Sequence, residues 1–284
     1  MLGHSGKQLR PLLSLLTAAA LRGSCNETVC RVAATAELLH TATLMHDDVA
    51  DNSPLRRGLP TVMAMFGSTQ SVLVGDFWLS RAIGLIVDHP DRRVIKCYSK
   101  CLEDLAEGEM LQLEKSVNLD TTEEDYRRII YCKTASLFEA AVLSAAYSVG
   151  ATEEEVTACR KFACHVGMAF QIMDDIFDYC PEIKAGKPSG HDILEKKLTL
   201  PVLGFLKNAE RSVKNKFLAD VREQVDGLSE RTIELVRQYG GIEYARTCLQ
   251  NDVDVAVSAL SAFPDSEFKS NLAAIAVRLS SRKY

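Results

Sequence analysis

The sequence predicts an all-α protein, on three observations. Only 8 prolines and 16 glycines occur among 284 residues, and residues 91–180 contain no proline. A sheet of many short strands would need far more turn residues. Apolar residues instead recur at spacings of three and four, as at Leu12, Leu15 and Ala19, which is the period of an amphipathic helix. We therefore expect a bundle of about ten helices.

Start and stop signals place the helices of the first half. An amphipathic stretch covers residues 12–19, and Asn26 is a suitable N-cap for the next helix. The polar segment 52–60 interrupts the helical pattern. A further helix is expected over 68–87, ending before Pro90, and the same apolar period continues over 102–113.

The second half contains equally clear signals. Thr121 or Thr122 can cap a helix whose first turn is acidic, Gly150 ends that helix, and Thr152 begins the next. The turn-rich segment 180–190 predicts a mobile surface loop. Without an internal repeat, we expect one domain over residues 1–284. Because amphipathic sequence starts almost at once, an N-terminal helix is expected to be missing.

Composition narrows the function classes. With 47% apolar and 25% charged residues and a formal net charge of −5, the chain is globular and lacks the positive field of a general nucleic-acid binder. Nine cysteines without a CxxC pair indicate reduced thiols in the cytoplasm. No apolar run reaches the roughly 18 residues of a membrane span, and no signal peptide is evident. We expect neither a secreted nor an integral membrane protein.

A first acidic cluster, Asp47, Asp48 and Asp51, follows a long apolar helix. Asp47 and Asp51 would stand one turn apart on the same face, where like charges repel. Acids at a helix C-terminus are further disfavoured by the helix dipole. A solvated helix end is the alternative interpretation.

A second cluster, Asp174, Asp175 and Asp178, repeats the same DDxxD spacing 127 residues later. Two facing helices that each carry carboxylates one turn apart would form a site too acidic to stay empty. All-oxygen ligands suit Mg²⁺, which shares its coordination shell with substrate phosphates. The pair of clusters therefore predicts a diphosphate bridged by magnesium ions.

Five motifs in order make the chain resemble a trans-isoprenyl diphosphate synthase of the polyprenyl branch, of octaprenyl or hexaprenyl type. They are GKQLRP at 6–11, ELLHTATLMHDDVADNSPLRRG at 37–58, KTASLF at 133–138, FQIMDDIFD at 170–178 and GKPSGHDILEKKLTLP at 186–201. The resemblance implies helices around a deep central cavity and repeated addition of isopentenyl diphosphate to an allylic diphosphate. One departure is Lys196, where the family has glycine.

The resemblance also assigns roles to residues of this chain. The metal ligands would be Asp47, Asp51, Asp174 and Asp178, supported by Asp48 and Asp175. The leaving diphosphate would be held by Arg56, Lys133, Lys187 and Lys197, and isopentenyl diphosphate by Lys7, Arg10, His40 and Arg57. Thr134 and Gln171 match positions that direct oxygen dipoles at the allylic cation.

Small residues one turn before the first cluster, Ala42 and Thr43, would leave the cavity open below it. We therefore expect a C30 to C45 product, grown from a farnesyl or geranylgeranyl diphosphate primer, with a floor at Phe77, Trp78, Tyr98 or another residue. The implied enzyme is a homodimer whose lipid product passes to a membrane.

Three other functions remain open on the sequence. A class I terpene cyclase would not need the second set of cations, Lys7, Arg10 and Arg57. A helical phosphohydrolase built on His46 and Asp47 would need further histidine ligands. A regulatory subunit of a heteromeric synthase would be expected to have lost one acidic cluster.

Overall fold

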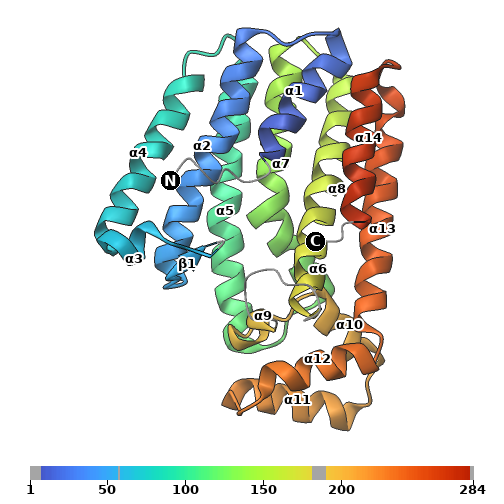
Figure 1. The fold of residues 1–284 in the computed structure, drawn as a ribbon. Coiled ribbons are helices and arrows are strands. Elements are labelled where there is room, and N and C mark those ends of the chain that lie inside the picture. Colours follow the sequence, from blue (N-terminus) through green and yellow to red (C-terminus); the bar gives the residue numbers. More distant parts are fainter. Residues whose placement is uncertain (1–7, 57, 181–189, 282–284) are drawn as a thin grey trace. The chain divides into compact units, whose positions relative to one another are not determined.

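The computed structural model describes residues 8–56, 58–180 and 190–281. Helices dominate them, which confirms the all-α prediction (Figure 1). The α-helices are α1 (Leu9–Arg22), α2 (Glu27–Ala50), α3 (Val62–Phe66), α4 (Ser68–Ile86), α5 (Arg92–Asn118), α6 (Glu123–Ile130), α7 (Ser136–Ser148), α8 (Glu153–Asp178), α9 (His191–Leu194), α10 (Leu200–Asn208), α11 (Arg211–Glu223), α12 (Leu228–Gln238), α13 (Gly241–Ala259) and α14 (Glu267–Ser280). The expectation of about ten helices was too low, because short helices such as α3 and α9 give little periodic signal.

Several predicted boundaries are confirmed. The Asn26 side chain accepts a hydrogen bond from the Val29 N–H at the start of α2. Thr122 caps α6 in a capping box with Asp125. Between α2 and α3, strands β1 (Leu55–Arg56) and β2 (Leu59–Pro60) form an antiparallel hairpin inside the expected polar break.

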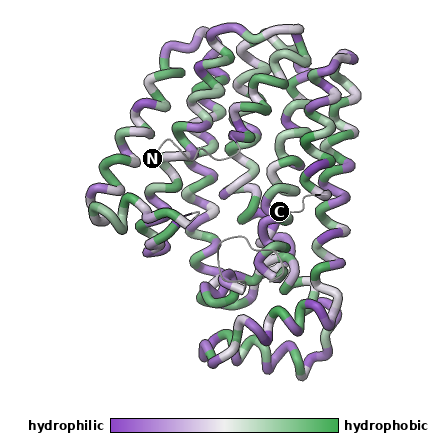
Figure 2. The backbone as a smooth tube through the Cα atoms, in the orientation of Figure 1, coloured by the Kyte–Doolittle hydropathy of each residue, from purple (hydrophilic) through white to green (hydrophobic). Residues whose placement is uncertain are grey.

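The chain divides into two compact units, described separately below. The first comprises Met1–Cys101, Leu137–Arg160 and Leu260–Leu272. Within it α2 packs along α4 and against α1 (Figure 1). The Ser14 hydroxyl of α1 donates to the Ala141 carbonyl of α7, and the fully buried Tyr98 donates to the Val32 carbonyl of α2. Hydrophilic and hydrophobic residues are interspersed along these helices (Figure 2).

The second unit comprises Leu102–Ser136, Lys161–Ala259 and Ala273–Tyr284. Part of its core is aromatic, with the Phe205 and Phe217 rings edge to face at 5.0 Å between centroids. Buried Asp252 of α13 accepts from His165 of α8 at 2.7 Å and from Arg127 of α6 at 3.4 Å, so one carboxylate ties three helices together. The prediction of a single domain with a central cavity stays a prediction.

One helical stretch, Glu123–Ser148, is long and apolar enough to cross a membrane by length and composition. Because 89% of its most apolar window is buried, it also fits a core helix of a soluble protein. All nine cysteines are free thiols, as the sequence predicts.

Candidate active site

The first acidic cluster lies at the C-terminal end of α2. The Asp51 N–H donates to the Asp47 carbonyl at 2.8 Å, which confirms that these two residues stand one helical turn apart. Asp51 is exposed and Asp47 is half-buried. The chain thus presents two carboxylates at the end where the helix dipole disfavours them, as the sequence analysis expects.

The central residue of this cluster, Asp48, has a different environment. Asp48 is 5% exposed, and its Oδ1 accepts from Arg56 Nε of β1 at 2.8 Å. This ion pair holds the hairpin against the end of α2 and fixes the Arg56 guanidinium near the cluster. Arg57, the next predicted cation, lies outside the described residues.

His46 packs against α4. A Cβ added at Gly75 would lie only 2.4 Å from His46 Nε2, so only glycine leaves room for the imidazole there. His46 Nε2 also lies 3.3 Å from Asp76 Oδ1. These contacts support a packing role for His46 beside the acidic turn.

The second acidic cluster ends α8, and its central residue Asp175 is 5% exposed. Its Oδ2 accepts from the Tyr126 hydroxyl at 2.6 Å, and its Oδ1 accepts from Gln171 Nε2 at 2.8 Å. Burial raises the pKa of Asp175 to about 7, the two hydrogen bonds oppose that rise, and the charges of Asp174 and Asp178 add to it.

Asp178 anchors the next element. Its Oδ1 accepts from the His191 N–H at 3.1 Å and its Oδ2 from the Asp192 N–H at 3.0 Å, at the start of α9. Asp192 thereby joins the cluster, and burial together with the charges of Asp175 and Asp178 raises its pKa well above the usual range. The sequence analysis missed Asp192, although its place between Lys187 and Lys197 in the last motif was the available signal.

Thr134 and Gln171, which the resemblance paired in one role, are in direct contact. The Thr134 hydroxyl donates to Gln171 Oε1 at 2.7 Å. Thr134 lies in a π-helical turn, η2 (Tyr131–Ala135), that joins α6 to α7. Such turns insert one extra residue into a helix and are frequent at functional sites. The sequence did not predict this turn.

The predicted lysines have carboxylate partners. Lys133 of η2 forms an ion pair with Glu109 of α5, and Lys197 forms one with Glu195. Lys196, which stands where the family has glycine, adopts a left-handed conformation at φ 59°. That conformation explains the family preference, because a left-handed backbone favours glycine. Lys187 lies outside the described residues.

Two more predicted residues lie in the first unit. The Arg10 guanidinium stacks on Phe138, with its Cζ 4.5 Å from the ring centroid. His40 is half-buried on α2, seven residues before Asp47. Lys7, the third predicted cation for isopentenyl diphosphate, lies outside the described residues. The binding roles of all these residues stay predictions.

The carboxylates of each cluster suit a divalent cation. In the second cluster, burial raises the pKa values of Asp175 and Asp192, and the charge of the neighbouring Asp178 raises both of them further. A bound cation would relieve that repulsion, and all-oxygen ligands favour magnesium or calcium over softer metals. The donor set therefore fits the predicted ion.

A model of the family described as polyprenyl synthetase matches residues 1–236. The chain belongs to the polyprenyl synthetase family. Over 272 residues it is 39% identical to the all-trans-nonaprenyl-diphosphate synthase (geranyl-diphosphate specific) of Rhodobacter capsulatus, covering 94% of this chain and 82% of the relative. It is 38% identical to the octaprenyl diphosphate synthase of Escherichia coli strain K12, covering 95% of this chain and 84% of that one.

A solved structure agrees with this assignment. The polyprenyl synthase of Caulobacter crescentus CB15, complexed with calcium and isoprenyl diphosphate, has a TM-score of 0.91 at 35% identity and covers 99% of this chain and 86% of its own. As a polyprenyl synthetase, the chain is a prenyltransferase of the medium- and long-chain trans type.

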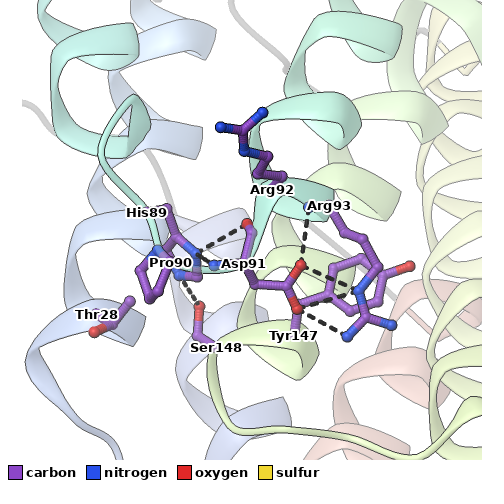
Figure 3. A pocket seen from close by; sticks show the side chains of 8 residues that line it. All are labelled: Thr28, His89, Pro90, Asp91, Arg92, Arg93, Tyr147 and Ser148. Atoms are coloured by element: carbon purple, nitrogen blue, oxygen red, sulfur yellow. Dashed lines mark hydrogen bonds and ion pairs between the residues drawn. The ribbon is translucent and has the colours of Figure 1, made fainter.

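A pocket of about 460 Å³ in the first unit is lined by residues that lie outside the five sequence motifs (Figure 3). His89 Nδ1 lies 3.0 Å from the Asp91 backbone nitrogen and 3.1 Å from the Asp91 carbonyl oxygen, and His89 Nε2 lies 3.0 Å from Ser148 Oγ. The Ser148 hydroxyl donates to the Ser144 carbonyl at 2.7 Å and not to the histidine, so the pair is not arranged as an activated nucleophile. The lining consists of Thr28, His89, Pro90, Asp91, Arg92, Arg93, Tyr147 and Ser148.

Proposed function

We propose that this chain catalyses the magnesium-dependent, head-to-tail condensation of isopentenyl diphosphate with an allylic diphosphate. The observation that carries the proposal is the pair of DDxxD clusters at the ends of α2 and α8 in a chain of the polyprenyl synthetase family. The carboxylates Asp47, Asp51, Asp174 and Asp178 would hold Mg²⁺. When bound, the metal supplies Lewis-acid stabilisation of the departing diphosphate.

The cations of the chain hold the two diphosphates. Arg56 is placed by its ion pair with Asp48, so its remaining guanidinium nitrogens can bind phosphate oxygens. Lys133 forms an ion pair with Glu109, and Lys197 forms one with Glu195. A diphosphate, which carries more negative charge, would compete with Glu109 and Glu195 for these ammonium groups. Lys187 completes this group, and Lys7, Arg10, His40 and Arg57 bind isopentenyl diphosphate.

The allylic cation is stabilised by oxygen dipoles. Because the Thr134 hydroxyl proton is committed to Gln171 Oε1, the lone pairs of Thr134 Oγ1 remain for a positively charged carbon. The homoallylic double bond then attacks that carbon, and the departed pyrophosphate accepts the proton released in the last step. Preorganised dipoles of this kind are effective because they need no reorientation during the reaction.

The distance along α2 between Asp47 and the level of Tyr98 can be compared with the length of the product. The Tyr98 hydroxyl binds the Val32 carbonyl, 15 residues before Asp47 and so about 22 Å along the helix. At about one isoprene unit per turn of roughly 5.4 Å, a straight path to Tyr98 holds about four units. A C30 to C45 product must therefore pass Tyr98 or turn away before reaching it. Ala42, 1% exposed and one turn before Asp47, belongs to the wall.

We also propose a cytoplasmic homodimer. Apolar side chains on α3 and α4 are largely exposed: Met65, Phe66, Leu73 and Phe77 are each more than half exposed. A second copy would cover such a surface. Free thiols and the mostly buried apolar stretch Glu123–Ser148 are compatible with a cytoplasmic enzyme that passes its lipid product to a membrane.

The test is incubation with farnesyl or geranylgeranyl diphosphate, labelled isopentenyl diphosphate and Mg²⁺, followed by mass analysis of the extracted lipid. We expect prenyl chains that increase by C5 steps and accumulate between C30 and C45. A single cyclic hydrocarbon formed without isopentenyl diphosphate would support a cyclase. Activity only after addition of a second protein would support a regulatory subunit.

A further inference from the structure

The strongest unassigned feature is the hydrogen bond between Tyr126 of α6 and Asp175 of α8. Tyr126 is 3% exposed and Asp175 is 5% exposed, so neither group can exchange its partner for bulk water. Burial and the Asp175 charge raise the pKa of Tyr126 well above its usual range. The phenol therefore remains protonated and acts as a permanent donor.

This bond is the end of a chain of hydrogen bonds. Tyr126 Oη donates to Asp175 Oδ2 at 2.6 Å, Gln171 Nε2 donates to Asp175 Oδ1 at 2.8 Å, and Thr134 Oγ1 donates to Gln171 Oε1 at 2.7 Å. Each link fixes the next. The carboxylate selects the amide end of Gln171 that faces it, and the opposite end of that amide then selects the direction of the Thr134 proton.

The π-helical turn brings Tyr126 and Thr134, the two ends of this series of hydrogen bonds, onto one face of their helix. Tyr126 and Thr134 are eight residues apart on a continuous helical stretch. In an uninterrupted α-helix eight residues rotate by about 800°, which is roughly 80° beyond two full turns. The Ser136 N–H bonds to the Tyr131 carbonyl, five residues back, so the turn holds one extra residue. That extra residue offsets most of the 80°, and both side chains reach α8.

We propose that Tyr126 is a positioning residue for the prenyl-transfer site: through Asp175 and Gln171 it orients the Thr134 hydroxyl so that its lone pairs face the reacting carbon. The inference rests on the proposed function. Without the Tyr126 donor, Asp175 loses one of the two groups that hold its carboxylate, and the orientation of Gln171 is no longer fixed.

The test compares Tyr126→Phe with Tyr244→Phe. The Tyr244 hydroxyl also donates to a carboxylate of α6, that of Glu123. Its Phe variant therefore loses the same kind of bond, but one outside the series that links Tyr126 to Thr134. We expect Y126F to lower kcat about 10-fold, with KM for both substrates and affinity for a slowly ionising thio analogue of the allylic substrate changed less than threefold. Y244F should keep kcat within twofold. Thermal melting checks that both variants fold.

Thr134→Val separates positioning from a general structural effect. If the four hydrogen-bonded residues act as a unit, adding Y126F to the T134V variant lowers kcat by less than a further threefold. Adding Gln171→Met to T134V should also lower kcat by less than a further threefold. The Q171M variant keeps the test decisive should Y126F fail to fold. A kcat for Y126F within threefold of wild type, or the same fold-loss in both backgrounds, overturns the inference. A wild-type chain that does not elongate any primer overturns the proposed function instead.

Discussion

Gly75 of α4 leaves room for the His46 side chain of α2, and Gly75→Ala tests that packing directly. The new Cβ would lie 2.4 Å from His46 Nε2 and 2.6 Å from its Cδ2, so the imidazole must move by about 1 Å to reach ordinary contact. Overpacking of this kind costs about 1–3 kcal/mol. Alanine in place of glycine inside a helix returns about 1 kcal/mol.

Gly84→Ala is the matched control, because a Cβ at Gly84 on the same helix meets no atom within 4 Å. G84A should therefore be more stable than wild type by up to about 1 kcal/mol, and G75A should be less stable than G84A by about 1–3 kcal/mol. For a chain of this size 1 kcal/mol corresponds to about 2 °C in melting temperature. Thermal melts should place G75A about 2–6 °C below G84A.

His46→Ala provides the second arm of the cycle. In the H46A background the imidazole is gone, so Gly75→Ala should become stabilising by about 1 kcal/mol. Since His46 precedes Asp47, G75A alone should also reduce turnover by displacing the acidic turn. Equal melting temperatures for G75A and G84A, or the same G75A effect with and without His46, would refute the proposed close packing.

Three further predictions concern product length, backbone strain and ion pairing. Ala42→Phe should shorten the product, and an unchanged product length in a radiolabelled chain assay would contradict the wall assignment. Lys196→Gly relieves a left-handed lysine at φ 59° and should raise stability by about 0.5–1 kcal/mol, measured by thermal melting; a lower melting temperature would count against the strain. Glu155→Gln removes a two-pronged ion pair with Arg22, at 2.8 and 2.7 Å, that lowers the pKa of Glu155. A carboxyl group whose pKa is lowered in the folded state stabilises the fold at pH values above its unfolded-state pKa, and this stabilisation is lost as the pH falls. E155Q should therefore be less stable than wild type by about 1 kcal/mol at pH 7, and this stability difference should shrink below about pH 4. A stability difference that does not change with pH would argue against the ion pair.

Local signals in the sequence predicted the secondary structure well. The caps at Asn26 and Thr122 and the helix end near Gly150 depend on neighbouring residues alone, and each is confirmed. The π-helical turn at Tyr131–Ala135 could not be predicted, because the sequence YCKTA is compatible with an ordinary α-helix. The contact that accompanies the turn, between Thr134 and Gln171, is a tertiary contact that no local pattern specifies.

The site was predicted from motif resemblance, and its supporting contacts were not. Tyr126 lies 49 residues from Asp175, and Asp192 reaches the second cluster because its backbone N–H donates to the Asp178 carboxylate. Contacts over such separations depend on helix packing, which no local pattern specifies. Gly75 is similar, since its need for glycine arises from His46 on another helix.

The proposed function requires that both aspartate clusters contribute to binding divalent ions and one diphosphate. The most direct measurement is Mn²⁺ binding, followed by electron paramagnetic resonance, with and without a thio analogue of farnesyl diphosphate that ionises slowly. We compare the wild type with Asp47→Asn and Asp174→Asn. The account predicts that the analogue strengthens Mn²⁺ binding to the wild type and that either substitution removes this gain. A full gain in either variant would contradict a site shared by both clusters.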